Sequence, residues 1–180
     1  MKVIPCAYQR RYIEWMPRGT GSGAPIKIYT PDEARPPTER NKDDNREYVV
    51  GGEGTYIEET HQHFVIILNA DGTTQFALVA MKSTQLKKSR KWNSMVQSRS
   101  MVGANGPFTP PRFSHVYLLK TASEKNDKGS WDGWEISVVD VVSDTTQYVQ
   151  AKTFAESILK GDVTVKHSDD SEEKSSDIPW

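Results

Sequence analysis

Two apolar, strand-like segments joined by a tight turn constrain the fold of this chain most. Residues 56–69 end in the apolar run Phe64-Val65-Ile66-Ile67-Leu68, and a second segment follows at residues 73–81. Between them, Asn69-Ala70-Asp71-Gly72 contains the Asp-Gly pair that favours a short hairpin turn. The sequence therefore predicts two antiparallel strands that pair in a β-sheet.

Further strand and helix patterns lie on both sides of this hairpin. Residues 83–101 have helical spacing, and Ser83 or Thr84 can cap the first turn. Residues 148–160 are amphipathic and end at Gly161, a residue that favours helix termination. The other strand candidates are residues 7–15, 26–29, 48–50, 113–121 and 131–142, of which the last two are joined by a turn at 126–129.

The order of the main elements places a helix between the third and fourth strands of a five-stranded set. This is the plan of the OB fold, a small Greek-key barrel. We expect a mainly β protein with two helices, built as an OB-fold-like five-stranded antiparallel barrel, and a mixed α+β sandwich is the alternative. Residues 1–160 are expected to form this domain, with a long loop or arm at 16–46, and residues 161–180 a disordered acidic tail.

Composition argues against several classes of protein. The sequence has no run of eighteen apolar residues that could span a membrane, and we expect no signal peptide. Cys6 is the single cysteine, so neither an internal disulfide nor a thiolate-rich zinc site is expected. These features predict a protein of the reducing cytoplasm with no membrane partner.

The net charge of −1 hides an asymmetry along the chain. Residues 167–180 hold one Lys against five Asp and Glu, a net charge of −4. The remaining residues hold 22 Lys and Arg against 19 acids, a net charge of +3. A basic body can bind a polyanion, and an acidic tail can shield the binding surface while it is empty.

The last fourteen residues cannot build a core, because their only apolar side chains are those of Ile178, Pro179 and Trp180. An acidic segment of this kind usually only aids solubility. This one ends differently, because Pro179 restricts the backbone, Trp180 offers a large apolar surface, and a terminal carboxylate can pair with an arginine. The tip is therefore predicted to be a peptide that another protein captures.

The segment Asp177-Ile178-Pro179-Trp180, placed after an acidic run, resembles the C-terminal tip of bacterial single-stranded-DNA-binding proteins, whose acidic tails end in Asp-Ile-Pro-Phe. The likeness covers residues 169–180, where Trp180 replaces the final phenylalanine and residues 174–176 interrupt the acids. The middle of the chain is similar to bacteriophage-encoded members of that class in layout alone. The resemblance implies single-stranded DNA as the ligand. It also implies replication or repair proteins, such as a primase, an exonuclease or a clamp-loader subunit, as partners of the tip.

Six Lys or Arg and no acid lie between Met81 and Met101. A helix face that is merely solvated usually alternates charges for i,i+4 pairing, so a single-sign field favours contact with phosphate. Rings near cations suit stacking on bases, with core packing as their alternative role. Phe64, Phe76 and Phe154 lie in apolar runs and are assigned to the core. The residues predicted to bind single-stranded DNA are Arg10, Arg11, Trp15, Lys82, Lys87, Lys88, Arg90, Lys91, Trp92, Arg99, Phe108 and Tyr117.

Patterns that carry chemistry elsewhere are incomplete in this sequence. His61 and His63 would share one face of a strand and could both ligate a metal, but no motif places a third ligand. Cys6 has no neighbouring histidine or helix start that could activate its thiol. We expect no catalytic residues, no metal and no cofactor, and therefore no enzymatic activity.

These observations predict a non-catalytic, sequence-independent single-stranded-DNA-binding protein that acts in DNA replication, recombination or repair, in a bacterial or phage-infected cell. One alternative is an adaptor that uses its tail to capture the partners of the host's own single-stranded-DNA-binding protein. A second is an RNA-binding or virion protein. Assembly into a homo-oligomer is compatible with each of them.

Overall fold

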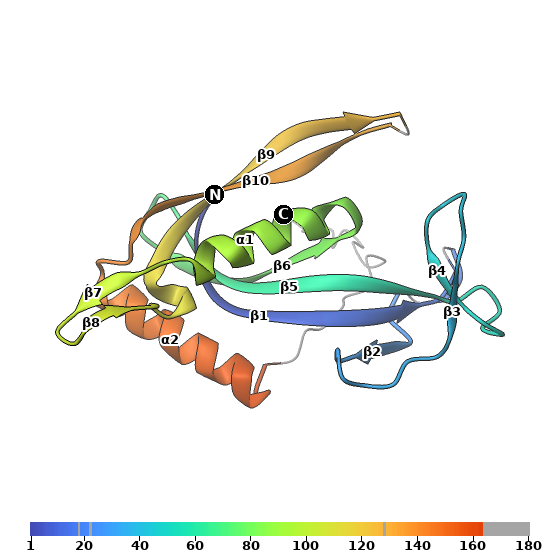
Figure 1. Ribbon diagram of the computed structural model, residues 1–180, viewed down its shortest axis with the longest axis horizontal. Coiled ribbons are helices and arrows are strands. Elements are labelled where there is room, and N and C mark those ends of the chain that lie inside the picture. The colour runs from blue at the N-terminus through green and yellow to red at the C-terminus, as the bar shows by residue number, and fades with distance from the viewer. Residues whose placement is uncertain (18, 22, 128, 164–180) are drawn as a thin grey trace, which may run out of the picture. The chain divides into compact units, whose positions relative to one another are not determined.

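The computed structural model describes residues 1–163 apart from 18, 22 and 128, and this part of the chain is mainly β with two α-helices (Figure 1). Five of the described strands are long, and the other five have three residues each. The long strands are β1 (Lys2–Trp15), β5 (Tyr56–Leu68), β6 (Thr74–Lys82), β9 (His115–Asn126) and β10 (Gly129–Val141). The short strands are β2 (Lys27–Tyr29), β3 (Thr38–Arg40), β4 (Glu47–Val49), β7 (Met101–Gly103) and β8 (Gly106–Phe108). The helices are α1 (Leu86–Gln97) and α2 (Thr145–Lys160), with 3-10 turns η1 (Ser83–Gln85) and η2 (Arg112–Ser114).

The described chain divides into two compact units. The first unit consists of residues 1–10 and 60–163, and the second of residues 11–59. Strands β1 and β5 pass from one unit into the other, so each unit is built partly on the same two strands. The predicted arm at 16–46 belongs to the second unit, where it contributes β2 and β3.

The first unit is a strongly curled sheet in the order β10-β9-β1-β5-β6 (Figure 1). Strand β6 pairs with β5 in antiparallel register from Thr60 opposite Lys82 to Leu68 opposite Thr74, which confirms the predicted hairpin. Its turn is stabilised by the Asp71 carboxylate, which accepts a hydrogen bond from the Thr73 amide at 2.9 Å. Strands β9 and β10 form a second long antiparallel hairpin, as expected from the turn at 126–129.

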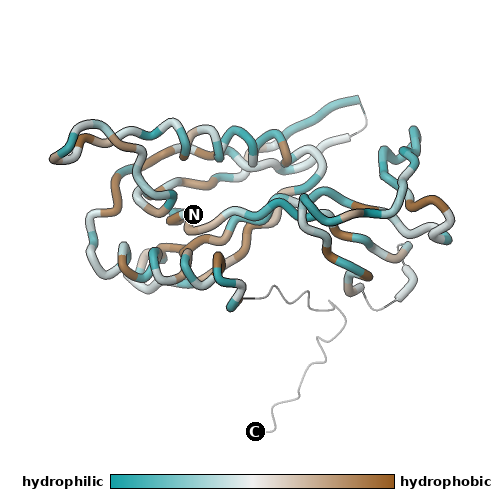
Figure 2. The backbone as a smooth tube through the Cα atoms, turned by 60° about the horizontal axis from the view of Figure 1, so that its bottom comes forward, coloured by the Kyte–Doolittle hydropathy of each residue, from teal (hydrophilic) through white to brown (hydrophobic). Residues whose placement is uncertain are grey.

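Both faces of this sheet are apolar, and each is covered by one helix. Consecutive residues of a strand point to opposite faces, so Val65 of β5 packs in the cluster that contains Trp92 of α1. Its neighbour Ile66 packs in the cluster that contains Ala151 of α2. Figure 2 shows the two helices on opposite sides of strands that carry hydrophobic stretches. Because a sheet with two apolar faces needs a cover on each, the first unit has three layers.

Helix α2 begins and ends at the signals that the sequence contains. The Asp144 carboxylate accepts hydrogen bonds from the amides of Thr146 and Gln147, at 2.7 and 3.1 Å. Gly161 closes the helix in the left-handed conformation at φ 81°, as predicted. Among the described helices, none is long and apolar enough to cross a membrane.

Three local expectations are wrong. Neither Ser83 nor Thr84 caps α1, because a 3-10 turn occupies residues 83–85 and the helix starts at Leu86 without a side-chain cap. Helix α1 stops at Gln97, and the Gly/Pro segment beyond it folds into the short hairpin β7–β8. Phe76, assigned to the core, packs on Phe154 of α2 with ring centroids 4.5 Å apart but is 52% exposed.

The second unit is built from the outer parts of β1 and β5 with three short strands. Strand β2 pairs antiparallel with β1, with Tyr12 opposite Tyr29, which confirms the strand expected at 26–29. Strand β4 lies between β3 and β5 and is antiparallel to both. Residues 16–46, which were expected to be a loop or arm, therefore contribute two short strands, which pair with β1 and β4.

Candidate nucleic-acid interface

Three of the predicted cations form an exposed row on α1. Lys87, Arg90 and Lys91 are spaced three and four residues apart, which places them on one side of the helix, and all three are exposed. The first turn of α1 contains no acid and the last turn no base. This arrangement opposes the helix dipole, whose positive end attracts anions. Lys87 lies in the first turn, where the dipole does not favour a cation, and Arg90 and Lys91 lie in the second turn, where the dipole has little effect.

Lys88, a fourth predicted cation, is engaged within the protein. Its ammonium group forms an ion pair with Glu124 of β9, and that carboxylate also accepts a hydrogen bond from the Trp131 indole at 3.0 Å. These contacts, of which the hydrogen bond from Lys88 is the strongest, lower the pKa of Glu124. Lys88 therefore links α1 to β9 and is not an independent contact for phosphate.

The buried side of α1 is held by a polar bridge to β5. The Ser89 hydroxyl lies 2.7 Å from His61 Nδ1 and 2.7 Å from His63 Nε2, so one hydroxyl joins both imidazoles. The His63 ring stacks on Trp92 with centroids 4.4 Å apart and 17° between the ring planes. Burial above all, with the nearby charges of Arg112 and His61, lowers the pKa of His63 to about 3. His63 is therefore a neutral core residue at physiological pH.

This packing removes two rings from the predicted DNA-binding set. Trp92 is 0% exposed and Tyr117 is 1% exposed, and their centroids lie 5.9 Å apart in the core. A base cannot stack on a ring that has no free surface, so both predictions as stacking residues are wrong. The spacing of Ser89, Trp92 and Val96 places them on one helix face, a periodicity from which burial of Trp92 could have been foreseen.

Two half-buried arginines act on the side chain of Tyr117. Arg99 donates a hydrogen bond to the Tyr117 side chain, and the charge of Arg112 acts on the same hydroxyl. The Arg112 guanidinium carbon lies 5.6 Å from the centroid of the Tyr8 ring. Burial is the main influence on the pKa of Tyr117, which it raises, and the two arginines oppose it. Arg112, which was missed at the sequence level because nothing local marks it, thus joins Arg99 in one cationic cluster.

The remaining predicted residues divide between the two units. Arg10 and Lys82 are exposed and belong to the first unit, and both make other interactions within the protein. Phe108 is also in the first unit, on β8, and is 47% exposed. Arg11 and Trp15 are half-buried residues of the second unit. The predicted tip, Asp177-Ile178-Pro179-Trp180, lies outside the described residues.

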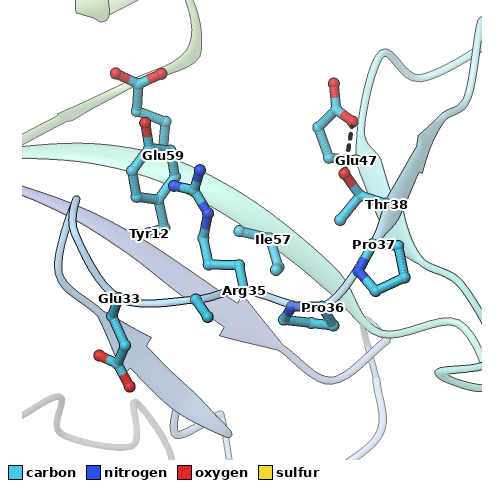
Figure 3. A pocket seen from close by; sticks show the side chains of 10 residues that line it. Tyr12, Glu33, Arg35, Pro36, Pro37, Thr38, Glu47, Ile57 and Glu59 are labelled. Carbon is cyan, nitrogen blue, oxygen red and sulfur yellow. Dashed lines mark hydrogen bonds between the residues drawn. The ribbon is translucent and has the colours of Figure 1, made fainter.

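A pocket in the second unit was not foreseen (Figure 3). It has a volume of about 610 Å³, and the Arg35 guanidinium carbon lies 3.5 Å from the centroid of the Tyr12 ring at its side. Its rim carries the carboxylate of Glu33, which pairs with Lys27 at 2.9 Å. The lining residues are Tyr12, Glu33, Ala34, Arg35, Pro36, Pro37, Thr38, Glu47, Ile57 and Glu59. With three carboxylates against one cation, this pocket does not suit a polyanion.

The two units have net charges of opposite sign. Residues 1–10 and 60–163 contain 14 Lys and Arg against 9 Asp and Glu, a net charge of +5. Residues 11–59 contain 7 against 10, a net charge of −3. Among the described residues, no group of three His, Cys, Asp or Glu side chains is arranged to hold a metal ion. A surface for a polyanion is therefore expected on the first unit.

Comparison with known proteins identifies one related family. The sequence profile of the Pam3 phage gp34-like protein family matches residues 1–164, which are nearly the whole chain. Neither a curated protein nor a solved structure matches.

Proposed function

The chain belongs to the family of Pam3 phage gp34-like proteins, and we propose that it binds single-stranded DNA without reading its sequence. In this proposal the protein is not an enzyme. It coats unpaired DNA during replication, recombination or repair in a phage-infected cell. The first unit holds the DNA, and the acidic C-terminal segment recruits other proteins.

The observation that carries the proposal is the strand order of the first unit. Strands β1, β5 and β6 follow one another, and β9 returns to lie beside β1, which is the spatial order of a Greek key. Strand β10 adds a fifth strand, and α1 lies between the third and fourth strands in chain order. This order is compatible with an OB fold, and it supports the proposal because OB-fold proteins bind oligonucleotides with a basic groove and stacking rings.

Charge is the second support. Lys87, Arg90 and Lys91 are exposed side chains in the first two turns of α1. Together with the net charge of +5 on the first unit, they suit a partner with closely spaced phosphates. Binding through such contacts releases counterions, so affinity should fall steeply as salt increases.

The tail completes the proposal. Residues 167–180 carry a net charge of −4, opposite in sign to the first unit, and end in the tip that resembles that of single-stranded-DNA-binding proteins. We infer that the acidic run competes with DNA for the basic surface. The tip, residues 177–180, then engages replication or repair proteins when DNA displaces it.

A direct test is titration of the full chain into a labelled oligo-dT at 50 mM salt, followed by fluorescence anisotropy. The expected result is tight binding that unlabelled oligo-dT competes away and duplex DNA does not. Binding should weaken at 200 mM salt. Absence of oligo-dT binding at 50 mM salt would falsify the proposal.

The same titration separates the two rival functions. Preference for single-stranded RNA over oligo-dT would indicate an RNA-binding protein. An adaptor that works through its tail alone would bind no nucleic acid, while a peptide of residues 167–180 would still bind host replication or repair proteins.

A further inference from the structure

The hairpin β7–β8 presents one aromatic ring on a flat support. Met101 pairs with Phe108, and Gly103 pairs with Gly106 at the turn. A Cβ atom placed on Gly103 would lie 3.3 Å from Cε1 and 3.4 Å from Cδ1 of Phe108, so the ring lies directly on the glycine. Phe108 remains 47% exposed. A ring held on one side and open on the other is an immobilised surface for a second flat ring.

The two arginines of the Tyr117 cluster flank the base of this hairpin in the chain. Arg99 lies two residues before β7, and Arg112 lies four residues after β8, in η2. Arg99 donates a hydrogen bond to Tyr117 and the charge of Arg112 acts on the same hydroxyl, so both side chains lie near Tyr117 and, along the chain, near the end of the hairpin where Phe108 pairs with Met101. The exposed ring and the two guanidinium groups therefore belong to one local region of the first unit.

Both guanidinium groups have hydrogen-bonding capacity that the described residues do not use. Arg99 Nε and Arg112 Nη1 are buried atoms without a hydrogen-bond partner among them. Neither arginine forms an ion pair with a carboxylate in the described part of the chain; Arg99 donates a hydrogen bond to Tyr117, and Arg112 lies over the Tyr8 ring. The charges of Arg112 and Arg99 also lower the pKa values of His63 and His115, respectively. A half-buried arginine without a counter-ion favours an anion, because pairing with one offsets more of its desolvation.

We propose that Phe108, Arg99 and Arg112 form a nucleotide subsite, in which one base stacks on Phe108 and an adjacent phosphodiester binds the two guanidinium groups. This subsite rests on the proposed function and specifies where the first unit contacts a single strand. Gly103 sets the orientation of the Phe108 ring, and Tyr117 holds Arg99 through the hydrogen bond that Arg99 donates to it. Stacking requires no particular base, which fits binding without sequence preference.

The ring is tested with a matched pair of variants. Phe108→Ala removes the platform, and Phe76→Ala removes a phenylalanine of similar exposure, 52% against 47%, on β6. Anisotropy with labelled oligo-dT at 50 mM salt should show about tenfold weaker binding for Phe108→Ala, the effect of losing one stacked base, and no change for Phe76→Ala. With an abasic oligomer of equal length, Phe108→Ala and wild type should bind alike.

The arginines are tested by the salt dependence of binding. Arg99→Gln and Arg112→Gln should each reduce the slope of log K against log salt by about 0.7, the contribution of one phosphate contact in a single strand. Arg112→Lys should keep the wild-type slope, which covers the case that Arg112→Gln does not fold. Inorganic phosphate at millimolar concentration should compete weakly and equally with wild type and Phe108→Ala.

The outcomes separate this inference from the proposed function. If wild type does not bind oligo-dT, both fail. If wild type binds and Phe108→Ala binds equally well, or if Phe76→Ala weakens binding as much, the subsite is wrong and the proposed function stands. An unchanged salt slope in both arginine variants would refute the phosphate contact of Arg99 and Arg112 without affecting the stacking contact of Phe108.

Discussion

Protonation of His63 should destabilise the fold by a predictable amount between pH 7 and pH 5. Burial, with the charge of Arg112 beside it, lowers the pKa of His63 from 6.5 in the unfolded chain to about 3 in the folded protein. The unfolded state therefore binds a proton that the folded state does not, so stability is lost as pH falls through 6.5 toward 3. Above pH 7 His63 is neutral in both states and contributes no pH dependence.

The magnitude follows from the unfolded pKa alone, because pH 5 lies well above the folded value. At pH 5 nearly all unfolded chains carry the proton on this imidazole and nearly all folded ones do not. The loss of unfolding free energy between pH 7 and pH 5 is therefore about 2 kcal/mol from this one residue. His63 Nδ1 has no hydrogen-bond partner in the described structure, so an imidazolium there would leave a buried charged donor unpaired.

The comparison that isolates His63 is a variant that keeps the ring shape but does not titrate. His63→Phe preserves a ring that can stack on Trp92, and Ser89 retains its contact with His61. Urea unfolding followed by circular dichroism at pH 7 and pH 5 should show a pH-dependent loss about 2 kcal/mol smaller in the variant than in wild type. His115, whose pKa burial also lowers, is present in both proteins and cancels. Equal losses in the two proteins would refute the assignment of His63 as a buried neutral residue.

Three further predictions concern DNA binding and the helices. Replacing Lys87, Arg90 and Lys91 together by Gln should reduce the slope of log K against log salt by about 2 in oligo-dT titrations, and an unchanged slope would exclude this face of α1 from the interface. Asp144→Ala should lower the unfolding free energy by about 1 kcal/mol in urea, because two amides at the start of α2 lose their acceptor. Deleting residues 167–180 should tighten oligo-dT binding at low salt, because the tail no longer competes with DNA, and should leave the affinity unchanged at high salt. If the truncated and the full chain bind equally well at low salt as well, the tail does not have this role.

The parts of the fold that the sequence predicted are those set by contacts between near neighbours. The turn at Asn69–Gly72 forms because Asp71 and Gly72 suit it, whatever surrounds the hairpin. The end of α2 at Gly161 was predicted for the same reason, whereas its start was placed at residue 148 and the Asp144 cap begins the helix at Thr145. The long strands overlap predicted segments because apolar and β-branched runs between turn residues are local signals, although β1 begins at Lys2 and not at residue 7.

The candidate site was only partly predictable, because it depends on which faces of the elements meet. Trp92 stands next to Lys91 in the sequence, and the spacing of Ser89, Trp92 and Val96 already indicates its burial, whereas the burial of Tyr117 is seen only in the packed structure. Phe76 lies in an apolar run, and β6 turns it to the face covered by α2, where its ring packs on Phe154 and stays 52% exposed. Arg112 acts on the Tyr117 hydroxyl to which Arg99 donates, a proximity that no local pattern indicates.

Sequence patterns were enough to predict a mainly β chain with two helices, the turn of the β5–β6 hairpin, and the excess of negative charge in residues 167–180. These properties arise from residues close in sequence or from composition, where local propensity and charge suffice. Only the tertiary structure shows that the two histidines share Ser89, that Tyr117 is core, and that Arg99 and Arg112 both act on that tyrosine. Each of those contacts joins residues from different elements, and its partners are selected by burial of whole faces against one another.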